Sequence, residues 1–300
     1  MRRWVSALLL ILAACAPAAP RTLPTAVNGP QPGIGTPPLT ADEVKNAEVA
    51  LATLTGDAPI KYQLADGAFQ KGTDPAGASL VSIKLVEPMA FGDLNGDGAG
   101  DAAALVAENY GGTGTFVSLV AFINANGKPV QAGIAAIDDR PLIGSLAIEA
   151  GLIGLEATVH RFEDPMCCPT LPTRRHYALG EGRLVQRDFA SQSESGAWRI
   201  IAITSPADGA QQGQSLKIQG TVTIAPFENN LSYHIMDAAG NELGAGPVPV
   251  AAGEIGGPGT FDVEVPLSTV PAGTKVWVEI RDQSPADGSV LAMDSVEIQP

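Results

Sequence analysis

The sequence predicts a mainly β protein with two folded parts, a small α+β domain followed by a β-sandwich. Short apolar or alternating runs, separated by turn residues, recur along most of the chain. Helical spacing of apolar residues occurs in one stretch only, just after residue 40. Charged residues make up only 17% of the 300 residues and glycines number 34, which is typical of strand-rich proteins with many turns.

The N-terminus predicts export and a lipid anchor. A positive start, Met1–Arg3, precedes an apolar run, Val5–Leu12, that is too short to span a bilayer. The next residues, LAAC, resemble the lipobox of bacterial lipoproteins. That resemblance implies a signal peptide over residues 1–14, cleavage before Cys15, and acyl chains on the cysteine thiol and usually on the new amine. A plain secretory signal with an incidental cysteine is the alternative.

Residues 15–40 form a predicted tether. Seven prolines and the lack of periodicity favour extended polyproline II structure, with a reach on the order of 75 Å. The chain carries a net charge of −14, and loss of Arg2 and Arg3 with the signal peptide changes it to −16. This charge argues against nucleic acid and against polybasic contact with anionic lipid. We therefore expect the membrane to be a partner through the lipid anchor alone, with the chain at the extracytoplasmic face of a bacterial membrane.

Residues 41–190 are predicted to form the α+β domain, with one helix on an antiparallel sheet. Thr40 and Glu43 form a capping box, and Gly56 marks the expected helix end. Apolar residues follow at helical spacing: Val44, Ala47, Leu51 and Leu54. Strand patterns then run from about residue 79 to residue 160.

The C-terminal part is predicted to be a sandwich of about seven strands. A polar segment, residues 191–198, is the expected junction before it. Residues 199–300 carry strand patterns such as SLKIQGTVT, NLSYHIMD, TFDVEVPL and TKVWVEIRD. Aromatic side chains expected in its core are Trp198, Phe261 and Trp277.

The sequence of residues 199–300 resembles the immunoglobulin-like domain of bacterial spore germination proteins, also called the second GerMN-associated domain. The resemblance implies a β-sandwich on exported proteins, often lipoproteins, that bind or assemble and have no catalytic residues. The first domain contains FGDLNGDGAGDAAALVAENYGGTGTFVSLVAFIN, DDRPLIGSLAIEAG and CCPT. These stretches resemble a group of exported bacterial proteins of unknown function, which implies no activity.

The loop DLNGDGAGD, residues 93–101, is a candidate calcium site. Carboxylate, amide and carbonyl oxygens at alternate positions suit Ca²⁺, and Gly98 permits the turn. An EF-hand is disfavoured because Ala104 stands where it needs glutamate. The pattern instead resembles the nine-residue loop of FG-GAP repeats, and we expect weak affinity, about 10⁻⁴–10⁻³ M. A polar β-turn would use the same residues. The candidate ligands are Asp93, Asn95, Asp97, Ala99 through its backbone carbonyl, and Asp101.

Adjacent cysteines, Cys167 and Cys168, are predicted to form a vicinal disulfide, because exported thiols tend to oxidise. With Cys15 occupied by lipid, the chain offers no third cysteine as partner. Two free buried thiols are one alternative. A zinc site built from these cysteines with His160 and His176 is another, although its spacing matches no standard zinc motif.

We therefore expect non-catalytic binding or scaffolding at the bacterial cell envelope, against a wall polymer or another exported protein. One alternative is an envelope hydrolase with its active site in residues 41–190. That site would join His160 or His176 to a carboxylate such as Asp139 or Asp164. The other is a sensory lipoprotein that responds to calcium or to redox state at its paired cysteines.

Overall fold

The computed structural model describes residues 36–52, 58–73, 80–180, 182–211 and 213–299. The predicted signal peptide, Cys15 and most of the tether lie outside these residues. The part of the chain that is described is mostly β-strand with one short α-helix, which confirms the predicted fold class. No helix in it is long and apolar enough to cross a membrane.

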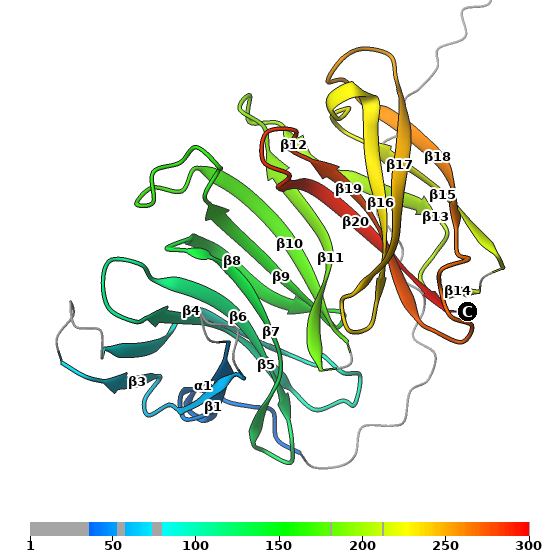
Figure 1. Cartoon of the computed structure of the whole chain (residues 1–300). Coiled ribbons are helices and arrows are strands. Elements are labelled where there is room, and N and C mark those ends of the chain that lie inside the picture. The colour runs from blue at the N-terminus through cyan, green and yellow to red at the C-terminus, as the bar shows by residue number, and fades with distance from the viewer. Residues whose placement is uncertain (1–35, 53–57, 74–79, 181, 212, 300) are drawn as a thin grey trace, which may run out of the picture.

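The N-terminal part has three layers (Figure 1). The outer layer consists of α1 (Ala41–Lys45), β1 (Glu48–Leu51) and β2 (Ile60–Gln63). The middle layer is a five-stranded antiparallel sheet in chain order: β3 (Ala68–Lys71), β4 (Val81–Gly92), β5 (Asp101–Asn109), β6 (Phe116–Asn124) and β7 (Pro129–Asp139). Strand β5 is buried on both faces. Its Ala104 belongs to one core with Val44 of α1, and its Leu105 to another with Leu155 of the third layer.

Within the described residues, the predicted long helix is wrong beyond its first turn, and its expected end at Gly56 lies outside them. The capping box forms as expected: Thr40 Oγ1 accepts from the backbone N–H of Glu43 at 3.3 Å, and Glu43 accepts from the N–H of Thr40 at 2.7 Å. The helix nevertheless ends at Lys45, and β1 follows. The apolar residues of β1 alternate between buried and less buried positions, a pattern that also suits a strand. Two features favour the strand. Strand β1 pairs with β2, and the Gln131 amide accepts from the backbone N–H of Ala50 and donates to its carbonyl.

The third layer is part of a sheet of thirteen strands that continues into the C-terminal part (Figure 1). Its N-terminal section is antiparallel: β8 (Leu142–Glu149), β9 (Leu152–Val159), β10 (Leu171–Gly180) and β11 (Arg183–Gln192). Strand β11 then pairs with β20 (Val290–Gln299), with Asp188 opposite Asp294 and Ala190 opposite Ala292. Two short strands lie beside this path, β12 (Trp198–Arg199) and β14 (Ala210–Gln211).

The C-terminal part is a sandwich. One layer contains β13 (Ile201–Ser205), β15 (Ser215–Val222) and β18 (Gly259–Pro266), and the other contains β16 (Asn230–Asp237), β19 (Val276–Gln283) and β20. A 3₁₀ turn, Phe227–Asn229, precedes β16. Strand β17 (Glu242–Ala252) pairs with β16 along most of its length and with β18 at its end, so it joins the two layers. The core between them includes Ile218, Leu231, Phe261 and Val278.

The predicted junction, residues 191–198, coincides with a tight turn between paired strands. Ser191 and Gln192 end β11, and Trp198 opposite Gln192 begins β12. The backbone N–H of Ser193 donates to the carbonyl of Ala197 at 2.9 Å. Strand pairing therefore continues across this segment.

Candidate binding site

A hollow lies on the exposed face of β8, β9 and β10. The strand register places Ala147, Gly154, His176 and Asp188 directly opposite one another across four strands. Residues opposite each other in neighbouring strands point to the same face, so these four form one row. Because Ala147 and Gly154 have little or no side chain, the surface is hollowed here, with a volume of about 380 Å³.

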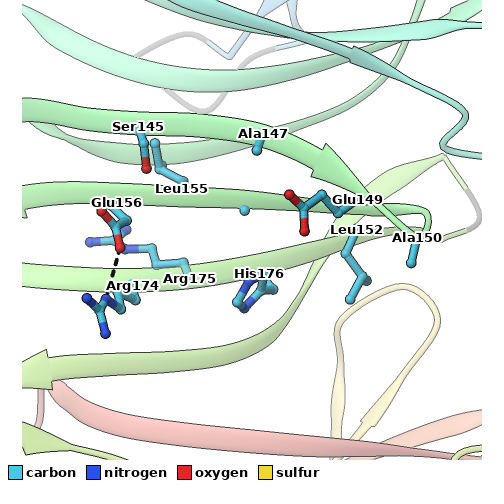
Figure 2. A pocket seen from close by; sticks show the side chains of 11 residues that line it. Ser145, Ala147, Glu149, Ala150, Leu152, Leu155, Glu156, Arg174, Arg175 and His176 are labelled. Atoms are coloured by element: carbon cyan, nitrogen blue, oxygen red, sulfur yellow. Dashed lines mark hydrogen bonds and ion pairs between the residues drawn. The ribbon is translucent and has the colours of Figure 1, made fainter. Parts of the chain in front are cut away.

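His176 forms one wall of this hollow (Figure 2). A Cβ atom added at Gly154 would lie 3.4 Å from the His176 ring, so the glycine lets the ring lie close to β9. The ring Nδ1 is 2.9 Å from both oxygens of Asp188. The hydrogen bond to Asp188 raises the pKa of His176 against the opposing effect of burial, and the charge of Glu149 also raises it. His176 is therefore predisposed to carry a positive charge.

An ion pair separates this hollow from a second one. Arg174 Nε donates to Glu156 Oε1 at 2.9 Å, and the guanidinium lies 4.1 Å from the ring centroid of Trp198. Both hollows include Arg174 and Glu156, and the second, of about 270 Å³, continues to Leu142 and Trp198. The two hollows lie on either side of this ion pair along the sheet face, and we call them together the groove. Trp198 thus lies beside this groove, not in the sandwich core as predicted.

The groove carries charged groups of both signs on the sheet face. Arg174 and His176 supply positive groups, and Glu149 and Glu156 supply carboxylates. The Arg174 and Glu156 side chains are 50% and 52% exposed. An ion pair this exposed to water contributes little to stability, so its partners can exchange each other for ligand groups. The groove suits a ligand that carries both carboxylate and ammonium groups.

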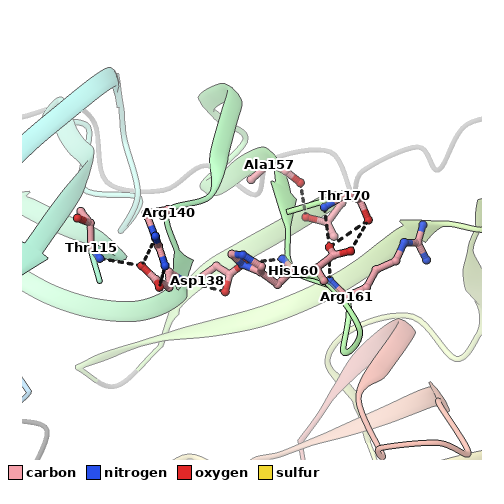
Figure 3. A network of polar contacts seen from close by, with 10 residues as sticks. Thr115, Asp138, Arg140, Ala157, His160, Arg161 and Thr170 are labelled. Atoms are coloured by element: carbon pink, nitrogen blue, oxygen red, sulfur yellow. Dashed lines mark hydrogen bonds and ion pairs between the residues drawn. The ribbon is translucent and has the colours of Figure 1, made fainter. Parts of the chain in front are cut away.

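A separate polar network lies where β7 ends and the β9–β10 loop begins (Figure 3). Asp138 accepts from the backbone N–H of His160 at 2.6 Å and lies 2.9 Å from its Nδ1. Asp139 accepts from Thr115 N at 2.7 Å and from the Arg140 guanidinium at 2.7 and 3.0 Å. Although burial opposes it, the hydrogen bond from Arg140 holds the pKa of Asp139 below its ordinary value.

The histidine–carboxylate pairs predicted for a hydrolase do not form, and each histidine pairs with a different aspartate. His160 forms its hydrogen bonds with Asp138, not with Asp139 or Asp164, and His176 pairs with Asp188. The two histidines belong to different places, the network and the groove. Asp188 could not be found from the sequence, because its proximity to His176 depends on the register of β10 against β11.

The predicted zinc site does not form. Cys167 and Cys168 are joined in a disulfide with an S–S distance of 2.27 Å, so they offer no thiolate to a metal. Across the described ranges, no three His, Cys, Asp or Glu side chains are grouped so that they could hold a metal ion. Both cysteines are exposed in the loop between β9 and β10.

The loop over residues 93–101 is closed by its own hydrogen bonds. Asp93 accepts from the N–H groups of Gly96 and Gly98 at 2.7 and 2.9 Å, and Asp97 from that of Ala99 at 2.7 Å. Asn95 accepts from the N–H of Asp97 at 3.0 Å. These bonds are those of a polar turn. Calcium binding remains a prediction from the sequence pattern.

Asp101 differs from the other acidic residues of the loop because its side chain is fully buried. One carboxylate oxygen accepts from Leu94 N and the other from Asn124 N, both at 2.8 Å. Asp101 therefore fixes the end of the loop to β6. Burial raises its pKa, and the nearby charges of Asp97 and Asp93 add to that increase.

Thermal unfolding tests the calcium prediction. We expect 10 mM Ca²⁺ added after EDTA to raise the unfolding midpoint, because an ion that only the folded chain binds stabilises the folded state by mass action. At a Kd of about 10⁻³ M the gain is about 1.4 kcal/mol. Asp97→Ala should abolish the increase. An unchanged midpoint for the unmodified chain would leave this loop as a hydrogen-bonded turn.

The topology of β13 to β20 defines an immunoglobulin-like sandwich. Residues 200–289 match the family model described as the immunoglobulin-like domain of bacterial spore germination. This match confirms the resemblance seen in the C-terminal sequence and covers less than half of the chain. Comparisons with curated proteins and with solved structures found no match.

Proposed function

We propose that this chain is an exported, lipid-anchored protein of the bacterial envelope that binds a wall polymer without catalysis. The observation that carries the proposal is the charged groove on β8, β9 and β10, whose ion pair is open to water. The immunoglobulin-like domain is consistent with a role in binding or scaffolding. Lipid on Cys15 would hold the chain at the membrane, and the tether would let the groove reach the wall.

The charges of the groove favour a polymer with peptide side chains. Such peptides carry carboxylates and amines in close succession. Arg174 provides two parallel N–H groups for a carboxylate once it separates from Glu156. Glu156 and Glu149 then remain to accept from ammonium groups. Trp198, which lies under the Arg174 guanidinium, offers an apolar surface at the far end of the groove.

Co-sedimentation of the full chain with purified wall polymer tests this proposal. We expect Arg174→Glu to weaken binding at least about tenfold, because loss of a charge-assisted hydrogen bond costs about 1.5–3 kcal/mol. Lys217→Glu is the matched control: Lys217 lies on β15 and forms a comparably exposed ion pair with Asp262 at 3.0 Å. If the two variants bind the polymer with equal affinity, whether that affinity is weakened or unchanged, the groove is not the binding site.

An envelope hydrolase acting at the same groove is the second candidate, and the His176–Asp188 pair favours it. Asp188 orients the ring through Nδ1, and Nε2 has no hydrogen-bond partner in the described part of the chain. A histidine held in this way can act as a general acid or base. The same experiment distinguishes the two functions. Hydrolysis, in place of binding alone, would be established if the unmodified chain releases soluble fragments from the polymer and the His176→Gln variant does not.

A further inference from the structure

The loop between β9 and β10 is held in shape without its disulfide. Asp164 accepts from the backbone N–H groups of Arg161 and Thr170 at 2.8 and 2.7 Å, and from the Thr170 hydroxyl at 2.9 Å. These bonds join the two ends of the loop. Nearer the tip, Cys168 N donates to the carbonyl of Pro165 at 2.8 Å. The fold around the loop therefore does not depend on the bond between Cys167 and Cys168.

Stabilisation of the fold does not account for this disulfide. Disulfides stabilise chiefly by restricting the unfolded chain, and the effect grows with the length of the loop that they close. The bond between Cys167 and Cys168 closes the smallest ring that two cysteines can form, and it links no two elements. Both residues are exposed, so a thiolate in solution can reach either sulfur atom.

His160 lies at the base of this loop, against the segment that carries the cysteines. Burial lowers the pKa of His160, but the hydrogen bond to Asp138 and the backbone of Met166 raise it, for a net increase. The other charged groups that face it are Asp139 at the end of β7 and Asp164 in the loop.

We propose that Cys167–Cys168 is a thiol–disulfide exchange site that an external dithiol reduces, with His160 as its positioning residue. A thiolate of the dithiol attacks one cysteine sulfur, the bond between the cysteines breaks, and the other cysteine leaves as a thiolate. The second thiol of the reductant then attacks its own sulfur in the mixed disulfide. Two electrons pass to the cysteines, two protons complete their thiols, and the reductant leaves as a disulfide.

The role of His160 is electrostatic. A histidine cation near a cysteine stabilises the thiolate relative to the thiol. In the reduced protein, an imidazolium held by Asp138 and by the backbone of Met166, the residue before Cys167, would favour the thiolate form of that cysteine. Since the thiolate is the reactive form, the rate of exchange and of alkylation should depend on His160.

Alkylation of the full chain under native conditions tests the site. Iodoacetamide is applied before and after dithiothreitol, and peptide mapping follows the segment that contains Cys167 and Cys168 separately from Cys15. We expect no label before reduction, two labels after it, and an unchanged unfolding midpoint. Labelling without reductant would show that no disulfide forms, and labelling only in denaturant would show that no reductant reaches it. Either result overturns the proposal.

The pH profile of alkylation of the reduced chain tests His160. We expect His160→Gln to move the midpoint to higher pH and to slow alkylation at pH 7 at least about threefold. His176→Gln is the matched control, since His176 also bonds an aspartate through Nδ1 at 2.9 Å but lies in the groove. Asp138→Asn keeps the imidazole and should shift the profile in the same direction, so the test survives if His160→Gln fails to fold. Identical profiles for all folded variants would exclude a role for His160.

Discussion

Asp101→Asn should destabilise the protein by about 2 kcal/mol, because it leaves a buried N–H group without an acceptor. Both carboxylate oxygens of Asp101 accept backbone hydrogen bonds, from Leu94 and from Asn124. Asparagine retains one acceptor and turns an N–H₂ group toward the other donor. Asp101→Ala should be worse, since it removes both acceptors and leaves a cavity. Urea unfolding, with equal m-values for the variants, measures the difference.

Asp97→Asn provides the matched control for Asp101→Asn. It is the same substitution in the same loop, and Asp97 is exposed where Asp101 is fully buried. In EDTA, where a bound cation cannot contribute, we expect Asp97→Asn to change stability by about 0.5 kcal/mol or less. If the two variants unfold at the same urea concentration, burial of Asp101 does not determine its contribution.

The strands could largely be predicted from the sequence, whereas the extent of the helix could not. Alternation of apolar residues and turn signals are local properties, so the sandwich and most strands of the first part follow from them. The capping box at Thr40 and Glu43 is local too, and it forms. The chain beyond Lys45 is decided by distant partners, the strand β2 and the side chain of Gln131. Tertiary contacts of this kind override helical spacing.

The groove could not be predicted from the sequence, for a similar reason. Arg174 and His176 stand two apart in an alternating pattern, which predicts that they share a face of a strand. Which residues of neighbouring strands lie beside them depends on register, and a shift by one residue would turn a strand over. The register shifts by one residue where β11 bulges at Arg187, between the pairs His176–Asp188 and Tyr177–Gln186, and this shift sets the position of Asp188. The small residues Ala147 and Gly154 indicate a hollow beside His176 only once that register is known.

The joining of the two parts also depends on register. A polar segment with serine and glycine, residues 191–198, is typical of a flexible linker. Here the edge of β11 that does not pair with β10 pairs with β20, and the segment becomes a turn next to that pairing. The buried Ser191 hydroxyl donates to the carbonyl of Leu291 at 2.6 Å and strengthens the contact. The charged groove therefore lies on a sheet that is continuous with the immunoglobulin-like domain.

Gly220→Ala should destabilise the protein by about 3 kcal/mol, because the new methyl group has no space. Gly220 lies in β15, opposite Phe261 of β18 and Ile203 of β13. A Cβ atom there would be 2.2 Å from the Phe261 ring and 2.4 Å from the carbonyl oxygen of Ala202. The ring can turn only within a packed core, and the carbonyl belongs to a paired strand. Neither neighbour can move without loss of packing or of strand pairing.

Gly253→Ala is the control for this clash, and its expected effect has the opposite sign. No heavy atom lies within 4 Å of a Cβ at Gly253, and its backbone conformation is one that alanine adopts. Alanine there should stabilise by about 0.4–1 kcal/mol, because it restricts the unfolded chain. Thermal and urea unfolding of both variants should therefore diverge from the parent in opposite directions. In the double variant Gly220→Ala/Phe261→Leu, only part of the stability should return, because the contact with the Ala202 carbonyl persists. Full recovery would show that the ring alone excludes a side chain at Gly220.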